Sequence, residues 1–183
     1  MRTVHWILAI AWAAFLVTWV AAGWRKKRSV RRSVVPGFAG FVVVIVLLHY
    51  LLPRLPERLA APSPSLARGV LGDILCVIGV AYAIWARLAL GSNWGLPMSQ
   101  REQPELVTAG PYARVRHPIY TGIMLALLGT AVATGIGALV VALAFVAYFL
   151  ASAFREERHL RTEFPEAFPA YQARTTRFIP YLF

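Results

Sequence analysis

The sequence has 183 residues, of which 58% are hydrophobic and only 15% are charged. Soluble globular domains average about 25% charged residues, so this composition excludes an ordinary soluble domain. The formal net charge is +11, but the basic residues stand in clusters between long uncharged runs. That pattern is typical of a membrane protein rather than of a nucleic-acid-binding protein. The single cysteine, Cys76, excludes an intramolecular disulfide and a cysteine-based metal site, and no metal is expected.

Five apolar runs follow one another along the chain, each close to the roughly 20 residues that a membrane-spanning helix needs. The predicted spans are residues 3–24, 34–52, 69–90, 118–134 and 137–154. A basic cluster directly after the first run favours an uncleaved span over a signal peptide. In the third run Asp73 and Arg87 stand near the two ends, where we expect their side chains to reach the membrane interface.

The last two spans come from one stretch, Ile119 to Phe154, that holds no charged residue. As a single helix it would be about 54 Å long, which far exceeds a hydrocarbon core of about 30 Å. Residues 134–137, Thr-Gly-Ile-Gly, supply a break near its middle. We therefore predict an all-α integral membrane protein with five transmembrane helices, a tight hairpin of the fourth and fifth helices and a cytoplasmic C-terminal helical tail. The whole chain, residues 1–183, forms one membrane-embedded domain.

The distribution of Lys and Arg predicts which side of the membrane each segment faces. Six stand after the first span, three before the fourth and five in the tail, whereas four stand on the opposite side. Because basic loops stay in the cytoplasm, we expect the N-terminus outside and the C-terminus inside. The two polar segments that can hold a site, residues 91–118 and 155–183, then share the cytoplasmic face.

A polar and aromatic cluster opens the fourth span. Gly110-Pro111 predicts a turn, and Pro118 suits the first turn of a helix. Two tyrosines, two arginines and a histidine lie between residues 112 and 120. One interpretation is an interfacial belt, with the tyrosines at the lipid headgroups and the arginines on phosphates. The other interpretation is a binding site.

Two adjacent carboxylates, Glu156 and Glu157, follow the fifth span. One interpretation is a solvated helix in which Glu157 and Arg161 form an i,i+4 pair worth roughly a few tenths of a kcal/mol. Two carboxylates so near the membrane are unfavourable, however, unless cationic groups meet them. Because the fourth and fifth spans form a hairpin, both polar clusters emerge at the same end of one helix pair. That convergence favours one shared site.

The string Gly-Pro-Tyr-x-x-Val-Arg-His-Pro-x-Tyr-x-Gly occupies residues 110–122 and is followed by the apolar hairpin, the paired glutamates and an aromatic tail. Together these features resemble the isoprenylcysteine carboxyl methyltransferase family, and the related membrane phospholipid methyltransferases share much of the pattern. The resemblance covers about residues 91–183, while the first three spans contribute only hydropathy. It implies a cofactor-binding half at residues 91–183 and an enzyme that transfers a methyl group from S-adenosylmethionine.

The resemblance also implies roles for individual residues. His117, and after it Arg116, would hold the methionine carboxylate, whereas the paired glutamates would accept hydrogen bonds from the ammonium group and the ribose hydroxyls. The cofactor-binding residues are expected to be Val107, Gly110, Tyr112, Arg116, His117, Tyr120, Glu156, Glu157, Phe168 and Tyr171. The four aromatic side chains of that set would form a wall for adenine, and the tail would cover the cofactor. The catalytic residues are expected to be Arg155, Glu156 and Glu157.

The role of these catalytic residues depends on the methyl acceptor. Arg155 would hold an anionic acceptor such as a carboxylate, which needs no general base. With an amine acceptor, Glu156 or Glu157 would remove the proton. A prenylated cysteine-like carboxylate, a lipid amine, a quinone-like lipid and a small hydrophobic acid all stay open. The expected partners are therefore the bilayer and a lipophilic small molecule or lipid; neither a nucleic acid nor a protein partner follows from the sequence.

Two other functions share features with this sequence. Membrane reductases of the sterol or steroid type, which use NADPH, carry a similar Arg-His-Pro-x-Tyr string. A non-catalytic membrane module would use the same polar clusters only to bind a lipid or another subunit. Binding of a nicotinamide nucleotide would decide for the first, and binding of neither nucleotide nor S-adenosylmethionine would favour the second.

Overall fold

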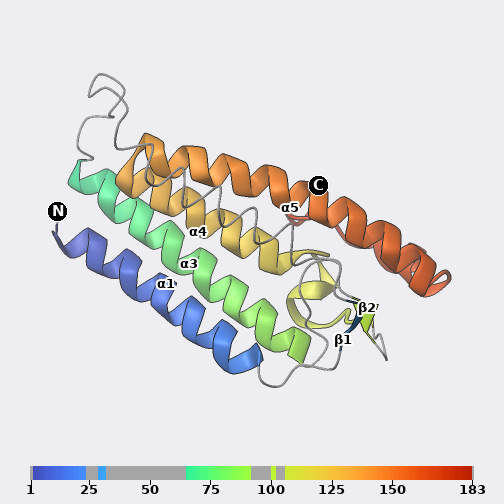
Figure 1. Ribbon diagram of the computed structural model, residues 1–183. Coiled ribbons are helices and arrows are strands. Elements are labelled where there is room, and N and C mark those ends of the chain that lie inside the picture. The colour runs from blue at the N-terminus through green and yellow to red at the C-terminus, as the bar shows by residue number, and fades with distance from the viewer. Residues whose placement is uncertain (1, 24–28, 32–64, 92–99, 102–105, 183) are drawn as a thin grey trace.

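The computed structural model describes residues 2–23, 29–31, 65–91, 100–101 and 106–182 (Figure 1). The helices are α1 (Arg2–Gly23), α3 (Leu66–Leu90), the short 3₁₀ helix η4 (Gly110–Ala113), α4 (Pro118–Thr134), α5 (Ile136–Glu163) and α6 (Ala167–Ala173). Within the described ranges, the one departure from the predicted all-α fold is a short antiparallel pair of strands. It joins β1 (Ser29–Arg31) to β2 (Gln100–Arg101). Figure 1 shows α1, α3, α4 and α5 side by side in that order.

Four of the five predicted spans are helices in the structure, and the second, residues 34–52, lies outside the described residues. The bounds of α4 are those predicted, and Pro118 opens the helix where its missing N–H removes no helical hydrogen bond. Gly135 separates α4 from α5 with a φ of 113°, a conformation that favours glycine. The hairpin therefore turns where the sequence predicts it. Helix α5 continues past the predicted end at residue 154 to Glu163, which carries its polar end beyond the apolar stretch.

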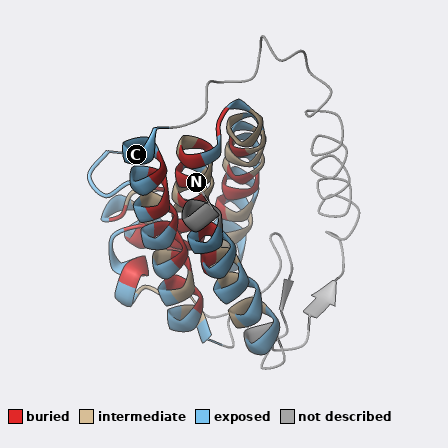
Figure 2. Cartoon of the chain, turned by 90° about the vertical axis from the view of Figure 1, so that its left-hand side faces the viewer, coloured by how far each residue is buried: buried red, intermediate tan, exposed pale blue. Residues whose placement is uncertain are grey.

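The described helices have the lengths and surfaces of a membrane protein. Among them, α3 and α5 are long and apolar enough for a complete crossing, whereas Trp6–Ala21 of α1 and Pro118–Thr134 are shorter apolar helices. In Figure 2 the buried residues lie mainly on the sides of the helices that face one another. The outer sides carry large apolar residues that are exposed, including Val17, Leu66 and Leu143. So much exposed apolar surface is typical of a protein solvated by lipid.

Helices α3 and α4 pack closely because small residues line both sides of their contact. Gly72 and Gly79 of α3 face Gly129 and Gly122 of α4, with a seven-residue spacing on each helix. A Cβ atom on Gly79 would lie 2.4 Å from the Ala126 nitrogen, and one on Gly129 equally close to the Cys76 nitrogen. Small residues in these positions let two membrane helices bring their backbones together. The α3–α4 pair is thus a backbone-to-backbone framework against which the site is built.

Two ionisable residues of α3 are covered by protein. Asp73 and Arg87 are only 5% and 2% exposed. The Arg87 Nη1 atom donates a hydrogen bond to the Gly91 carbonyl at 2.9 Å, just after the end of α3. Both ionisable side chains are therefore held within the protein.

The tail after α6 returns along the loop that precedes α4. Thr176 forms a parallel bridge with Val115, and the His117 amide donates to the Arg177 carbonyl at 3.1 Å. One turn into α4, the Thr121 hydroxyl donates to the Phe178 carbonyl at 2.8 Å. The side chain of Phe178 is buried in an apolar cluster with residues of α4 and α5. The tail is thus a built part of the fold that joins the loop to the hairpin.

Candidate functional site

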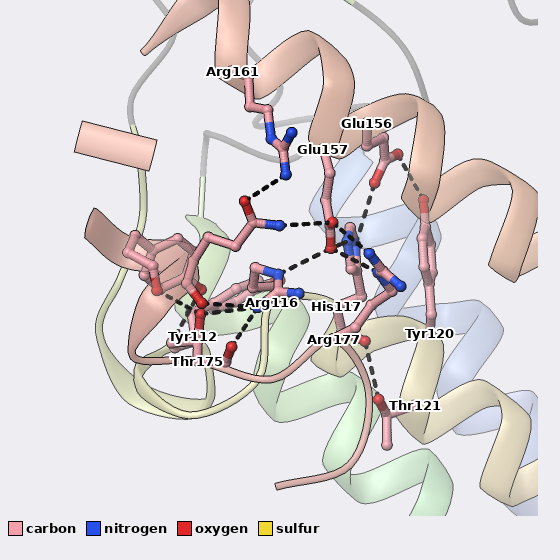
Figure 3. Close-up of polar contacts among 12 residues, drawn as sticks. Tyr112, Arg116, His117, Tyr120, Thr121, Glu156, Glu157, Arg161, Thr175 and Arg177 are labelled. Atoms are coloured by element: carbon pink, nitrogen blue, oxygen red, sulfur yellow. Dashed lines mark hydrogen bonds and ion pairs between the residues drawn. The ribbon is translucent and has the colours of Figure 1, made fainter. Parts of the chain in front are cut away.

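The predicted site residues converge where three segments meet: the loop before α4, the polar end of α5 and the returning tail (Figure 3). His117 occupies the N-cap position of α4, directly before Pro118, and its φ of −122° and ψ of 56° are not helical. Tyr120 follows one turn later on α4. Helix α5 brings Glu156 and Glu157 to the same point, because the hairpin returns the chain alongside α4.

Glu157 is the centre of the site. Its Oε1 atom accepts hydrogen bonds from Arg116 Nε at 2.9 Å, His117 Nε2 at 3.2 Å and Arg177 Nε at 3.0 Å. Its Oε2 atom accepts from Arg177 Nη2 at 2.9 Å and Gln172 Nε2 at 3.4 Å. The residue is 4% exposed. A buried carboxylate with three cationic neighbours is the compensated form that the interior tolerates.

The charges around Glu157 and His117 determine which protonation state each of the two side chains favours. Burial raises the pKa of Glu157, but hydrogen bonds from His117, Arg177 and Arg116 lower it more and hold it below its usual range. For His117, burial lowers the pKa, but the hydrogen bonds and charges of Glu156 and Glu157 outweigh that effect and raise it. The site therefore contains an ionised Glu157 beside a histidine that favours its charged form.

Glu156 lies on the other side of the same histidine. Its Oε1 atom accepts a hydrogen bond from the Tyr120 hydroxyl at 2.7 Å, and its Oε2 atom lies 3.5 Å from His117 Nδ1. The Glu156 side chain is 23% exposed, against 5% for Glu157. The two adjacent glutamates consequently differ in access: one is enclosed by the protein and one borders the surface.

Aromatic rings stack behind these polar groups. The His117 ring is parallel to the Tyr120 ring, with 5.4 Å between the ring centres. The Tyr120 ring in turn stacks on that of Phe149 of α5, with 4.5 Å between the centres. Tyr112 and Phe178 belong to the same buried apolar cluster. The site thus joins a charged end to an apolar body that continues between α4 and α5.

A second aromatic group holds α6 against η4. The Tyr171 hydroxyl donates to the Tyr112 carbonyl at 2.7 Å, and Phe168 meets the Tyr171 ring edge to face at 6.3 Å. Burial raises the pKa of Tyr171 to about 12, so its hydroxyl keeps the proton that it donates. Phe168, which has no exposed surface, anchors α6 to the rest of the site.

The structure brings most of the predicted residues together. Five share direct contacts: Arg116, His117, Tyr120, Glu156 and Glu157. Tyr112, Phe168 and Tyr171 adjoin them through the aromatic group just described, and Val107 packs against the apolar cluster. Gly110 begins η4 with a φ of 61°, a backbone conformation that favours glycine. Arg155 precedes the glutamates on α5, with an exposed side chain.

The alternative interpretation of the glutamates, an i,i+4 pair between Glu157 and Arg161, is not what the structure shows. Glu157 turns toward the loop and the tail. Arg161 instead donates from Nη2 to Gln172 Oε1 of α6 at 2.8 Å. The reason is that a buried carboxylate gains more from several buried donors than from one exposed arginine on its own helix.

Sequence reasoning assigned no role to Arg177, Gln172 or Thr175. Arg177 forms two hydrogen bonds with Glu157, and its guanidinium also lies 4.2 Å from the centre of the Phe154 ring. Arg116 Nη1 donates to the Thr175 carbonyl through a short hydrogen bond. Two glutamates near the membrane need cationic partners, so the sequence could predict that an arginine of the tail meets them. The tail contains several arginines, however, and only the fold selects Arg177.

The family follows from a match over more than half of the chain. The sequence pattern described as "Phospholipid methyltransferase" matches residues 67–167. The chain belongs to the phospholipid methyltransferase family. The match includes nearly all of α3 and the whole of α4 and α5, and it confirms the resemblance that the sequence motifs indicate. Members of this methyltransferase family are the reference for the function proposed below.

A solved structure confirms the architecture. The eukaryotic intramembrane Ras methyltransferase ICMT, an isoprenylcysteine carboxyl methyltransferase, superposes with a TM-score of 0.57 over 83% of this chain and 55% of that chain. The sequences are 24% identical, so the likeness shows the fold. The helical membrane fold is therefore shared with an intramembrane methyltransferase.

Two curated relatives carry other names. One is the "Cobalt-zinc-cadmium resistance protein CzcN" of Cupriavidus metallidurans, 37% identical over 119 residues, or 64% of this chain and 50% of the relative. The other is the "Nickel-cobalt-cadmium resistance protein NccN" of Alcaligenes xylosoxydans xylosoxydans, 34% identical over 116 residues, or 62% and 49%. The chain spans about half the length of these relatives. Within the described residues, no three His, Cys, Asp or Glu side chains are grouped so that they could hold a metal ion.

Proposed function

We propose that this protein transfers a methyl group from S-adenosylmethionine to a lipophilic acceptor at the cytoplasmic interface of a membrane. The observation that carries the proposal is the charged site at the end of an apolar helix hairpin, in a chain of the phospholipid methyltransferase family. A polar methyl donor can reach such a site from the water, and a lipophilic acceptor can reach it from the bilayer. Family membership also disfavours a nicotinamide-dependent reductase.

The side chains of the site suit the groups of the proposed donor. Glu156 would accept hydrogen bonds from the ammonium group, because charge-assisted hydrogen bonds to a carboxylate are strong. His117 and Arg116 supply positive charge for the donor's carboxylate. Tyr112 and Tyr120 offer aromatic faces, which attract both a flat base and a cation. When bound, S-adenosylmethionine supplies a methyl group on a positively charged sulfur.

The contribution of the protein to the transfer would be position and exclusion of water. An anionic acceptor needs no base, and the exposed Arg155, at the junction of the apolar and polar parts of α5, is placed to attract one. An amine acceptor must lose a proton, and Glu156 is the more accessible carboxylate for that task. The apolar body behind Tyr120 would hold the acceptor's hydrocarbon part.

Isothermal titration calorimetry in detergent tests the donor. We expect S-adenosylmethionine to bind the wild type, and Glu156→Gln and His117→Ala to weaken the affinity about 10-fold or more. A hydrogen bond to a charged group contributes about 1.5–3 kcal/mol, which corresponds to that loss. Glu166→Gln, an exposed glutamate at the start of α6, is the matched control. Equal affinity in all four proteins contradicts the site, and absence of binding to the wild type contradicts the function.

Methyl-labelled S-adenosylmethionine and membrane extracts identify the acceptor. A homologous series of acyl or prenyl acceptors in one liposome preparation then tests entry from the bilayer. Each buried CH₂ contributes about 0.8 kcal/mol to partitioning, so we expect activity to rise with chain length until the acceptor is fully membrane-bound. If the shortest, soluble member is methylated as efficiently as the longest, the acceptor does not enter from the membrane.

Cysteine labelling in intact cells tests the proposed orientation. A cysteine at Thr134, in the turn between α4 and α5, should react with an impermeant thiol reagent, and one at Glu166 should not. The native Cys76 is buried between α3 and α4 and provides a low background. The reverse labelling pattern would show that the N-terminus lies in the cytoplasm.

A further inference from the structure

The two neighbouring glutamates of α5 have different surroundings, and this difference assigns them different tasks. We propose that Glu157 is a positioning residue that fastens the tail to the loop before α4, while Glu156 is the carboxylate that meets the methyl donor. The inference rests on the proposed function for the task of Glu156. The fastening by Glu157 follows from contacts within this chain and can be tested without any ligand.

Glu157 has no acceptor capacity to offer a ligand. A carboxylate has about four lone-pair sites, and Glu157 already accepts five hydrogen bonds from four side chains. A bound ammonium group would have to displace one of these donors. Glu156 is more exposed, with its side chain 23% accessible, and it lies against the Tyr120 hydroxyl and His117 Nδ1 at the border of the site.

The donors to Glu157 come from two segments that lie far apart in the sequence. Arg116 and His117 belong to the loop before α4, whereas Gln172 lies in α6 and Arg177 in the tail that follows it. Arg116 also donates to the carbonyls of Gln172 and Thr175, so it joins the tail directly. One carboxylate on α5 therefore holds both segments to the helix and to each other.

The same carboxylate orients the rest of the site. Its hydrogen bond to His117 Nε2 directs Nδ1 of the ring toward Glu156. The ring then lies parallel to Tyr120, whose hydroxyl donates to the same Glu156. Without Glu157, three cationic side chains would be left together, and the tail would lose two of its attachments. Glu157 thus acts on the donor site through His117 and the tail.

Hydrogen–deuterium exchange of the full-length protein in detergent tests the fastening. Tail peptides covering residues 171–182 and loop peptides covering 112–120 contain the amides of Arg116, His117 and Thr176, which bond across the two segments. We expect these amide hydrogens to exchange at least tenfold faster in Glu157→Gln and in Arg177→Gln than in the wild type. Arg177→Lys, which keeps the charge but not the two-pronged contact, should fall between. Glu156→Gln and Glu166→Gln should stay within twofold of wild type.

The outcomes separate the two parts of the inference. Wild-type exchange in Glu157→Gln and Arg177→Gln overturns the fastening, as does equal acceleration in Glu156→Gln. If Glu157→Gln does not fold, Arg177→Gln and Arg177→Lys decide the question, because they change only the tail. For the donor, Glu156→Gln should lower affinity in both the free and the acceptor-bound protein. Arg177→Gln should lower kcat more than affinity, and a reversed ranking overturns the division of tasks.

A wild type that binds no S-adenosylmethionine contradicts the proposed function. The exchange measurement still decides whether Glu157 fastens the tail, so the two failures are distinguishable.

Discussion

The contact between α3 and α4 and the charged site at the other face of α4 hold their segments together in opposite ways. Along α3 and α4, glycines bring two backbones together, and the neighbouring side chains at the contact include the small ones of Ala83 and Ala133. At the site, long charged side chains from three segments reach one buried carboxylate. The first contact depends on volume, since any added atom meets backbone. The second depends on charge, since its strength follows the protonation of Glu157 and His117.

The two contacts differ in the functional groups that they can offer. A glycine contact offers no functional group, but it fixes the position of α4 against α3. The charged site offers many functional groups and needs a fixed support to hold them in place. Helix α4 supplies both, because its α3 face carries Gly122 and Gly129 while its first turn carries Tyr120. Perturbations of volume and of charge should therefore affect the two regions differently.

The largest expected effect comes from removing the central charge. Glu157→Met leaves Arg116, His117 and Arg177 without their shared carboxylate, and breaking a buried ion pair costs about 3–5 kcal/mol. Thermal unfolding in detergent measures the loss. Glu166→Met, at the exposed N-cap position of α6, is the control and should change stability by less than about 0.5 kcal/mol. A loss as small as that of the control would mean that the charged site does not stabilise the fold.

Added volume at the α3–α4 contact should have the next largest effect. In Gly79→Val, the new Cβ would lie 2.4 Å from the Ala126 nitrogen, so the helices must separate. Overpacking of this kind costs about 1–3 kcal/mol, measured by the same unfolding experiment. Ala81→Val, an exposed position on α3, adds volume outside the contact and should be nearly neutral. If both valines have the same effect, the close approach of α3 and α4 is not what Gly79 provides.

Acid should weaken the charged site. The pKa of Glu157 is below its usual value in the folded protein, so its stabilisation is present above about pH 4.3 and is lost as the pH falls toward the folded pKa. A protonated Glu157 would face Arg116, Arg177 and a charged His117, with Glu156 beside it. We expect the unfolding temperature to fall more between about pH 5 and 3 in wild type than in Glu157→Gln. Parallel pH profiles would assign acid sensitivity to other groups.

Alkali should act through the histidine with the opposite sign. The folded pKa of His117 is raised, so its stabilisation is complete below its unfolded value of about 6.5 and is lost as the pH rises through the folded value. The unfolding temperature of His117→Gln should not show this loss as the pH rises. If it falls with pH as in the wild type, the titrating group is another residue.

The smallest expected effect separates the aromatic group from the charged centre. Tyr171→Phe removes one hydrogen bond, from the Tyr171 hydroxyl to the Tyr112 carbonyl, and keeps the ring. One such bond contributes about 0.5–1.5 kcal/mol. Tyr181→Phe, an exposed tyrosine of the tail, is the matched control and should be neutral. A loss that approaches that of Glu157→Met would show that α6, rather than the charged centre, holds the tail.

The helices of the hairpin and the segments that carry the site can be predicted from local sequence patterns. Lengths of apolar runs follow from the thickness of a bilayer, and Pro118 and Gly135 mark the ends of α4 through their own backbone preferences. These are local properties, so they can be read without a fold. The convergence of the two polar clusters also followed, because a hairpin returns the chain to its starting end.

Which groups meet within that end depends on how the helices and the tail pack in three dimensions. Glu156 and Glu157 are neighbours in the sequence, but successive residues of a helix point about 100° apart, so they face different surroundings. Whether Glu157 turns toward Arg161 or toward Arg116 and Arg177 depends on the path of the tail, which no local pattern specifies. The close contact of α3 and α4 likewise required two distant glycine pairs to be brought face to face. The length of each apolar helix follows from the thickness of the membrane and can be predicted one helix at a time. The partners of a buried charge or of a glycine contact, in contrast, are defined only once the helices have packed.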